Sequence, residues 1–348
     1  MKNVFAAILF FLSLGLQAQT IEGTIYDVKT RETIPGVAIF LDGTSVVTTS
    51  DNEGRFKLII EKQINTNLIF SHLSYESLVI QPPFNHLEST FFLQERQNTL
   101  QGAVVIADRY TRTEKMKVFK EQFLGTGQAG KSCVILNEED IVLNYNSVTS
   151  TLTGHSNNPI IVENQYLAYH ITFYLHDFSV QYTENTLNIE KATRVLFKGT
   201  SSFFDQNPYN IRYKKRRDET YLSSPQYFWK NLVTNTLDEA KFRLFNRYAR
   251  MDPSKYFIII NEPSQKTVLI NLETNINRSH PYVHERPLYG VVGISNNNSK
   301  SNSEIVFLTR GFSVDDFGNP DTIDHLIFFG DMGAQRVGDM LPRDYNPQ

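Results

Sequence analysis

Short apolar runs alternate with turn residues from residue 20 to residue 108. Runs rich in β-branched and aromatic residues, such as 55–60 (RFKLII), are separated by Gly, Pro, Asn and Asp, and no helical period occurs among them. Strands at this spacing indicate an all-β sandwich of about seven strands. The run at 103–108 (AVVIAD) is expected to close it.

After residue 108 the pattern becomes mixed. Met116, Phe119 and Phe123 recur at i, i+3 and i+7, with Lys115 and most other charged residues expected to face solvent, which predicts an amphipathic helix. Within the segment 160–182, apolar residues at 169, 171, 173 and 175 alternate with residues 170, 172, 174 and 176, and this period of two predicts a half-buried strand.

Two further signals complete the fold prediction. The run 187–197 is expected to pair with that strand, and Ser224 followed by Pro225 predicts a helix start with Tyr227, Phe228 and Leu232 facing the core. The predicted fold is therefore multidomain, with an all-β sandwich at 20–108 and an α+β domain with a mostly antiparallel sheet at 109–348.

The N-terminal segment has the pattern of an export signal. Lys2 precedes an apolar stretch at 4–16, and the small residue Ala18 follows it. The stretch is shorter than the ~20 apolar residues that a spanning helix needs. We therefore expect residues 1–19 to be a signal peptide and the mature chain to have no transmembrane span. It would be periplasmic or associated with the outer membrane, and secretion remains open.

Net charge and cysteine content argue against two properties, nucleic-acid binding and an intramolecular disulfide. The formal net charge of the chain is −3, and this near balance argues against a nucleic-acid binder. Cys133 is the only cysteine, so no intramolecular disulfide can form.

One stretch of the first region carries a family resemblance. Its marks are Gly23 in the first strand, Pro35-Gly36 before the second, and Asp51 and Gly54 at the turn into the fourth. These residues resemble the carboxypeptidase regulatory-like domain, a prealbumin-type β-sandwich. The resemblance implies a module without catalytic residues that accompanies catalytic domains or precedes outer-membrane receptor barrels. The order of segments after it is similar to that of uncharacterised exported gram-negative proteins with the same first domain.

The segment 125–132 matches the spacing of a phosphate-binding loop, GxxxxGK[ST], through Gly125, Gly130, Lys131 and Ser132. Such a loop must follow a buried strand and open a helix, so that backbone N–H groups surround the phosphates. Here the pattern predicts a helix before the loop and a strand after it. We therefore interpret Gly125 as a helix-ending glycine, and no nucleotide or other cofactor is expected.

Catalytic motifs are incomplete. No His has Glu three residues later, as a zinc carboxypeptidase requires, and no GxSxG occurs. The best remaining candidates are His170, His176 and Asp177, with Glu163 nearby in sequence. The two histidines are six residues apart on one predicted strand, which places them on the same face but about 20 Å apart. The interpretation is two solvent-facing histidines.

Two charged clusters can each be interpreted either as a binding site or as an ordinary structural feature. Asp315, Asp316, Asn319 and Asp321, with Asp324, offer oxygens for a calcium ion, but the sequence between the neighbouring apolar runs is also typical of a hairpin. The run KKRR at 214–217 has the charge to bind an anionic glycan or lipid headgroup, and a solvated helical face is the favoured alternative.

The sequence as a whole predicts an exported, non-enzymatic protein of the cell envelope. It would act as a binding module whose partner is another envelope protein or a surface glycan. The alternative is a periplasmic hydrolase with an active site around residues 170–177.

Overall fold

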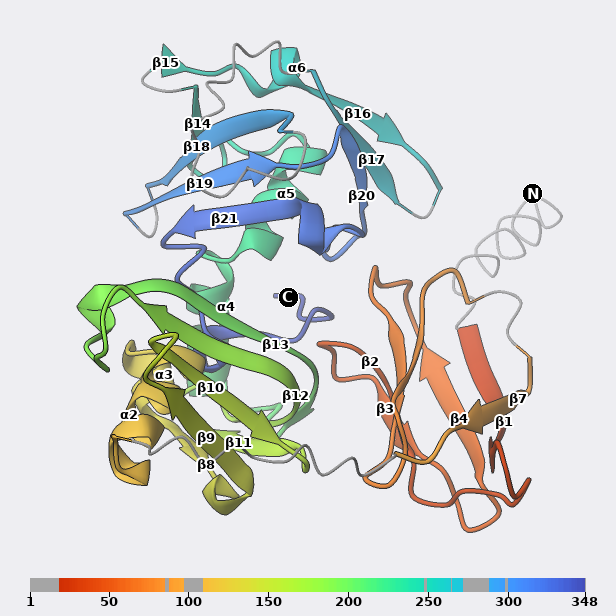
Figure 1. Ribbon diagram of the computed structural model, residues 1–348. Helices are drawn as coiled ribbons and strands as arrows, with labels where there is room; N and C mark the ends of the chain where they lie inside the picture. Colours follow the sequence, from red (N-terminus) through yellow and green to blue (C-terminus); the bar gives the residue numbers. More distant parts are fainter. Residues whose placement is uncertain are drawn as a thin grey trace, which may run out of the picture. The chain divides into compact units, whose positions relative to one another are not determined.

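The computed structural model describes residues 19–84, 88–96, 109–246, 249–263, 265–271, 288–297 and 300–347 (Figure 1). The chain divides into two compact units, one of Met1–Asp42 and Val46–Asn98, the other of Gly43–Ser45 and Thr99–Gln348. The expected signal segment, except Gln19, and the expected strand at 103–108 lie outside the described residues.

The first unit is a β-sandwich of two sheets, as the alternating pattern predicts. One sheet has the order β4-β1-β7 and the other β3-β2-β5-β6, and β1 runs antiparallel to β4 but parallel to β7. The strands are β1 Gln19–Asp27, β2 Ala38–Leu41, β3 Val47–Thr49, β4 Arg55–Ile60, β5 Leu68–Ser71, β6 Leu78–Ile80 and β7 Thr90–Leu93.

Aromatic rings from both sheets form the centre of the sandwich. The Phe70 ring lies 5.4 Å from Phe56 and 4.6 Å from Phe91, measured between ring centroids. Gly23 of β1 leaves room for this packing, because a Cβ at that position would lie 2.5 Å from the Ser89 carbonyl oxygen. The glycine of the family pattern therefore has a steric cause.

The second unit begins with a six-stranded antiparallel sheet (Figure 1). Its order is β8-β11-β12-β10-β9, and β13 pairs along the other edge of β12. The strands are β8 Cys133–Ile135, β9 Ile141–Asn146, β10 Thr151–Ser156, β11 Ile160–Asn164, β12 Tyr169–Tyr182 and β13 Ala192–Asp205.

Helix α2 (Arg112–Phe123) packs its apolar face on this sheet. Ring centroids of Phe119 and Phe178 are 4.7 Å apart, and those of Phe123 and Phe173 are 5.0 Å apart. The helical pattern is confirmed, but the expected position of Lys115 is wrong. Lys115 is buried, and its Nζ donates a hydrogen bond to the Leu143 carbonyl oxygen at 2.9 Å.

A second apolar core forms around helix α5, which begins after Ser224 as predicted. Phe228 and Leu232 are buried in it, Tyr227 is half-buried at its edge, and the fully buried Trp229 is a core residue that the pattern did not single out. Two antiparallel sheets surround α5, with the orders β15-β14-β18-β19-β21 and β16-β17-β20.

The remaining elements are short. The helices are α3 Gln128–Lys131, α4 Ile211–Tyr221, α5 Pro225–Val233 and α6 Pro253–Tyr256, and 3-10 turns occupy Glu138–Asp140, Ile189–Lys191, Ile323–His325 and Val337–Asp339. The strands of the second core are β14 Phe242–Asn246, β15 Ala249–Arg250, β16 Phe257–Asn261, β17 Lys266–Ile270, β18 Gly290–Asn296, β19 Ser301–Phe307, β20 Gly311–Val314 and β21 Leu326–Gly330.

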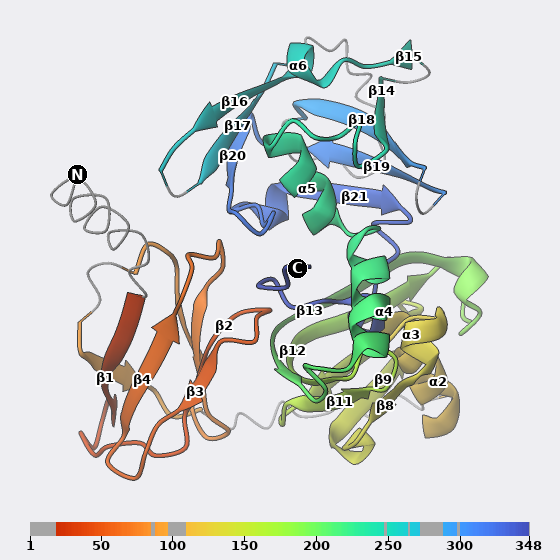
Figure 2. The same ribbon diagram turned by 180° about the vertical axis from the view of Figure 1, so that it is seen from behind.

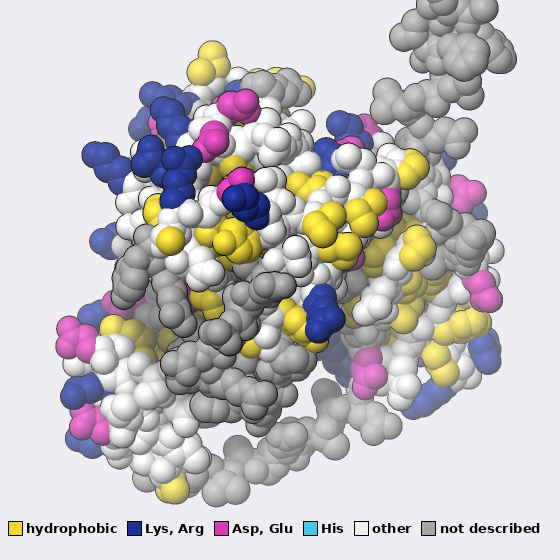
Figure 3. Space-filling view, turned by 90° about the horizontal axis from the view of Figure 1, so that it is seen from above, with side chains coloured by type: hydrophobic (Ala, Val, Ile, Leu, Met, Phe, Trp, Pro, Cys, Tyr) yellow, Lys and Arg dark blue, Asp and Glu magenta, His cyan; other side chains and the backbone are white. Residues whose placement is uncertain are grey.

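The surface carries both signs of charge. On the face seen from above, Lys, Arg, Asp and Glu side chains are interspersed with hydrophobic ones (Figure 3). None of the helices in the described ranges has the length and apolar content needed to cross a membrane.

The glycine-rich segment has the order that the sequence predicts. Helix α2 ends at the C-cap Leu124, Gly125 follows with φ +95°, and the chain reaches β8 after the single-turn helix α3. A left-handed residue directly after a helix is where glycine is preferred. Gly125 therefore ends a helix rather than opening a phosphate loop.

Close backbone packing requires glycine at positions 130 and 338. A Cβ on Gly130 would lie 2.3 Å from the Gly125 carbonyl oxygen, and a Cβ on Gly338 would lie 2.6 Å from the Gly130 Cα. The Gly338 N–H donates a hydrogen bond to the Leu124 carbonyl oxygen at 3.1 Å. The loop between α2 and α3 thus packs directly against residues 337–339.

Because of this packing, Gly130 and Gly127 should differ in how well they tolerate a side chain. Gly130→Ala should lower the free energy of unfolding by about 1–3 kcal/mol, because backbone must move to admit the methyl group. Gly127→Ala is the matched control, since its Cβ would meet nothing closer than 3.8 Å. Urea denaturation followed by circular dichroism and Trp229 fluorescence measures both. Equal stability of the two variants would show that glycine at 130 is not required by packing.

Candidate binding site

The strand β12 separates the predicted catalytic candidates. A β-bulge between Leu175 and Asp177 makes His176 an extra residue, so the inward positions change from odd to even numbers after it. His170 and His176 precede that change, and both lie outside the core, His170 half-buried and His176 exposed. His170 pairs in register with Glu163 of β11, whereas Asp177 pairs with Lys198 of β13.

These positions do not converge on one centre. His170 and Asp177 are roughly 20 Å apart at the rise of a strand. Among the residues that the structure describes, no group of three His, Cys, Asp or Glu side chains is arranged to hold a metal ion.

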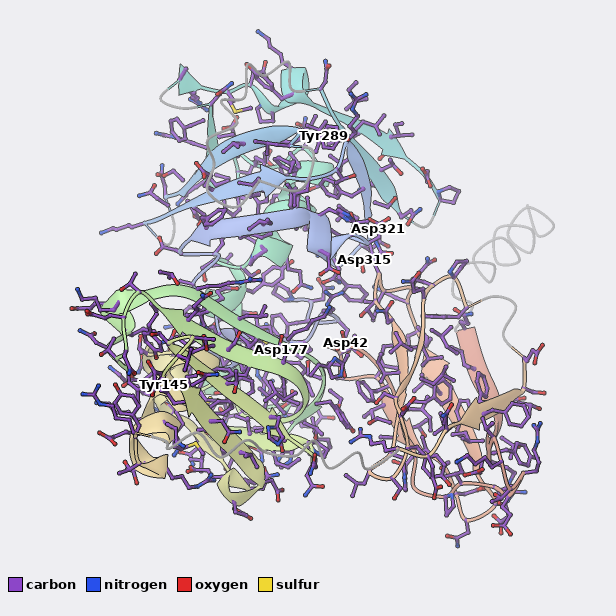
Figure 4. All side chains as sticks on the ribbon, viewed as in Figure 1. Asp42, Tyr145, Asp177, Tyr289, Asp315 and Asp321 are labelled. Carbon is purple, nitrogen blue, oxygen red and sulfur yellow. The ribbon has the colours of Figure 1, made fainter. Side chains whose placement is uncertain are left out.

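The acidic loop after β20 is a hydrogen-bonded turn. Asp315 is buried, and its Oδ1 accepts hydrogen bonds from the backbone N–H of Phe317 at 2.9 Å and of Asn319 at 2.8 Å. Asp321 Oδ1 accepts from the Ser313 N–H at 3.0 Å, while Asp316 is exposed. Figure 4 shows Asp315 and Asp321 at this loop, and their oxygens have backbone donors as partners.

A buried ion pair connects helix α4 to the sheet. Arg217, 4% exposed, donates two hydrogen bonds to the Asp205 carboxylate at the end of β13, at 2.6 and 2.7 Å. Its remaining donors reach the carbonyl oxygens of Leu167 at 2.7 Å and Ala168 at 3.1 Å, and its guanidinium lies 4.1 Å from the centroid of the Tyr169 ring. All of its hydrogen-bonding nitrogens thus have partners.

The charged run 214–217 therefore does not form a uniformly solvated face, and that expectation is wrong for Arg217. Lys214 and Lys215 fit the expectation better, because they form partly exposed i,i+4 pairs with Asp218 at 3.1 Å and Glu219 at 4.0 Å. The helical period separates them, since Arg217 faces the sheet and Lys215 faces solvent.

The turn between β11 and β12 is fixed from three sides. The buried Asn164 accepts hydrogen bonds through Oδ1 from the N–H groups of Tyr166 and Leu167, at 3.1 and 2.9 Å. Arg216 Nη1 donates to the Tyr166 carbonyl oxygen at 3.1 Å, and the Gln165 N–H donates to the Ser132 carbonyl oxygen at 3.2 Å. The turn, the end of α3 and the middle of α4 are thereby held together.

These three elements line an open surface pocket of about 640 Å³, which we call the basic pocket. Figure 2 shows α3 and α4 beside each other on this side of the second unit. The pocket is lined by Gln128, Lys131, Ser132, Gln165, Tyr166, Arg212, Tyr213 and Arg216. Its lining has three cationic side chains and no carboxylate.

The three cations differ in how firmly they are held. Arg216 is half-buried, and its guanidinium lies 4.4 Å from the centroid of the Tyr166 ring, a cation–π distance. Lys131 and Arg212 are exposed, and neither takes part in a salt bridge found within the described ranges. Their charge is available to a ligand.

The sequence signals for this pocket were present but were interpreted separately. Lys131 and Ser132 come from the GxxxxGK[ST] match, and Arg216 comes from the basic run 214–217. Only the fold brings the two motifs to one cavity. Arg212, Tyr166 and Tyr213 had no signal in the sequence that distinguished them.

A second cavity nearby has an excess of acidic side chains. It has a volume of about 490 Å³, and its lining includes one cation, Arg336, and three carboxylates, those of Glu121, Asp331 and Asp339. Burial raises the pKa of the Asp339 carboxyl and lowers the pKa of the Arg336 guanidinium. Asp339 also accepts a hydrogen bond from the Arg336 N–H at 3.2 Å, which closes the turn at 337–339. The Asp339 carboxylate therefore has a structural role in this turn.

Cys133 is not an activated nucleophile. Its Sγ donates to the Ala129 carbonyl oxygen at 3.3 Å, and burial raises the pKa of the thiol to about 12. The reactive thiolate is correspondingly scarce near neutral pH.

The comparison with family models finds a match in the first unit. Residues 21–105 match the family model described as CarboxypepD_reg-like domain, the family that the sequence pattern of this region resembles.

The other comparisons leave the second unit without a relative that carries an argument. A search of curated proteins gave no match. Among solved structures, a 9R-lipoxygenase from Cyanothece PCC8801 aligns at 9% identity with a TM-score of 0.18, over 62% of this chain and 48% of that chain. The chain thus spans about half the length of that structure, and a similarity this low supports neither fold nor activity.

Removing the buried ion pair should destabilise the second unit. Arg217→Ala leaves the Asp205 carboxylate without its cationic partner, and we expect a loss of about 3–5 kcal/mol in the free energy of unfolding. Lys215→Ala on the same helix is the control and should leave it nearly unchanged, because its pair with Glu219 is exposed. Urea denaturation tests this, and equal midpoints for the two variants would contradict it.

The half-buried thiol of Cys133 should resist alkylation. A rise in pKa from 9.0 to about 12 lowers the thiolate fraction near pH 8 by about a thousandfold, so iodoacetamide should label Cys133 far more slowly in the native protein than in urea. Mass spectrometry at timed intervals measures the two rates. Similar rates would mean that the thiol is accessible and ionised.

Proposed function

We propose that this chain is an exported, non-enzymatic protein of the cell envelope that acts by binding, and that its second unit binds an anion-bearing component in the basic pocket. The component is another envelope protein, a surface glycan or a lipid that carries phosphate, sulfate or carboxylate. Export is supported by the apolar N-terminal segment, and a binding role by the regulatory-like domain at 21–105.

One observation carries the proposal. Lys131, Arg212 and Arg216 line the same cavity without a carboxylate among the lining residues. Like charges held close together repel one another, and an anion relieves that repulsion while accepting charge-assisted hydrogen bonds. The tyrosine hydroxyl groups of the lining add neutral donors.

A binding role is favoured over the alternative of a hydrolase around residues 170–177. The candidate side chains His170 and Asp177 are spread along one strand and pair with different neighbours. Acid–base catalysis needs its groups within hydrogen-bonding reach of one reacting atom.

Calorimetry with inorganic phosphate and pyrophosphate tests the proposal. We expect saturable binding that weakens with added salt, and at least about a tenfold loss of affinity in Arg212→Ala and in Lys131→Ala, since each removes a charge-assisted hydrogen bond. Lys198→Ala is the matched control, because Lys198 is an exposed cation of β13 that does not line the basic pocket. Absence of binding, or equal affinity in all variants, would refute an anion site here.

A further inference from the structure

The turn between β13 and α4 presents large apolar side chains to solvent beside the basic pocket. Tyr209 is 96% exposed and Ile211 is 82% exposed, and the next residue, Arg212, lines the pocket. Phe204, two thirds exposed, precedes the turn on β13. Single exposed apolar residues are common, but this segment gathers them next to unpaired cations.

The turn has a defined conformation. Asp205, held by Arg217, accepts a further hydrogen bond from the Asn207 N–H at 2.8 Å. The Asn210 N–H donates to the Asn207 carbonyl oxygen at 3.3 Å, and Asn210 Oδ1 caps α4 by accepting from the Arg212 N–H at 3.0 Å. The exposure of Tyr209 and Ile211 therefore belongs to an ordered, capped turn.

We propose that this turn and the basic pocket together form a docking surface for a membrane with anionic lipids. Tyr209 and Ile211 would enter the interface between headgroups and acyl chains, while Arg212 and Lys131 bind lipid phosphates. Tyrosine is suited to that depth because its ring is apolar and its hydroxyl group polar. Weak apolar insertion and electrostatic attraction each bind a membrane poorly alone and become effective in combination.

The cations and the apolar side chains of this surface together favour an anionic membrane as its partner. A purely apolar partner would leave Arg212 and Lys131 without counter-charges, and a soluble anion would leave Tyr209 and Ile211 in water. A sheet of anionic headgroups above acyl chains satisfies both sets of residues. The inference rests on the proposed anion site and adds that the bound anion is the phosphate of a lipid headgroup.

Sedimentation with lipid vesicles tests the inference. The full chain, purified after export with its N-terminus determined, is mixed with vesicles of phosphatidylcholine alone or of phosphatidylcholine with phosphatidylglycerol. We expect binding to the anionic vesicles only, reduced by added salt. Arg212→Ala should weaken it about fivefold. The double variant Tyr209→Ser, Ile211→Ser should weaken it roughly tenfold and leave phosphate binding unchanged.

Val148→Ser is the matched control, because Val148 is 85% exposed in the turn between β9 and β10 and does not line the basic pocket. Its vesicle binding should equal that of the unmodified chain. Phosphate binding without vesicle binding would overturn the docking surface and leave the proposed anion site standing. Loss of both would overturn both, and equal binding to neutral vesicles, or no effect of the double variant, would overturn the membrane inference alone.

Discussion

The Arg217–Asp205 ion pair is the constraint on which the second unit's candidate site depends. A guanidinium that is almost fully buried must use its donors inside the protein, and here they reach one carboxylate and two carbonyl oxygens. Those acceptors belong to the end of β13 and the turn before β12. Together with the hydrogen bond from Arg216 to the Tyr166 carbonyl oxygen, this group fixes α4 against the sheet, and Arg212 lies on the same helix.

The same logic distinguishes structural charges from available ones. Arg217, Lys115 and Asp315 are buried and bonded to backbone or to a partner, so they specify geometry. Lys131 and Arg212 remain at the surface of a cavity. A ligand competes with water for such groups, whereas it would have to break the fold to reach the buried ones.

Local patterns explain which features the sequence predicted. The helix 112–123, the alternation of β12 up to Leu175 and the helix start at Ser224 depend on neighbouring residues, so periodicity and capping were sufficient. The bulge at His176 and the burial of Arg217 depend on partners in other strands and helices. The basic pocket could not be predicted without the fold, since Lys131 is about 80 positions from Arg212 and Arg216 in the chain, and Arg212 belonged to no motif.

The contact of Gly338 with the loop after α2 has a consequence for how the chain folds. Asn164 donates to the Gly338 carbonyl oxygen across 174 positions, and Val337 belongs to the core beneath α2. Such distant partners make closure entropically expensive and slow. During synthesis, the chain cannot complete this core until residue 338 has left the ribosome, so the apolar faces of the earlier segments stay exposed to solvent until then.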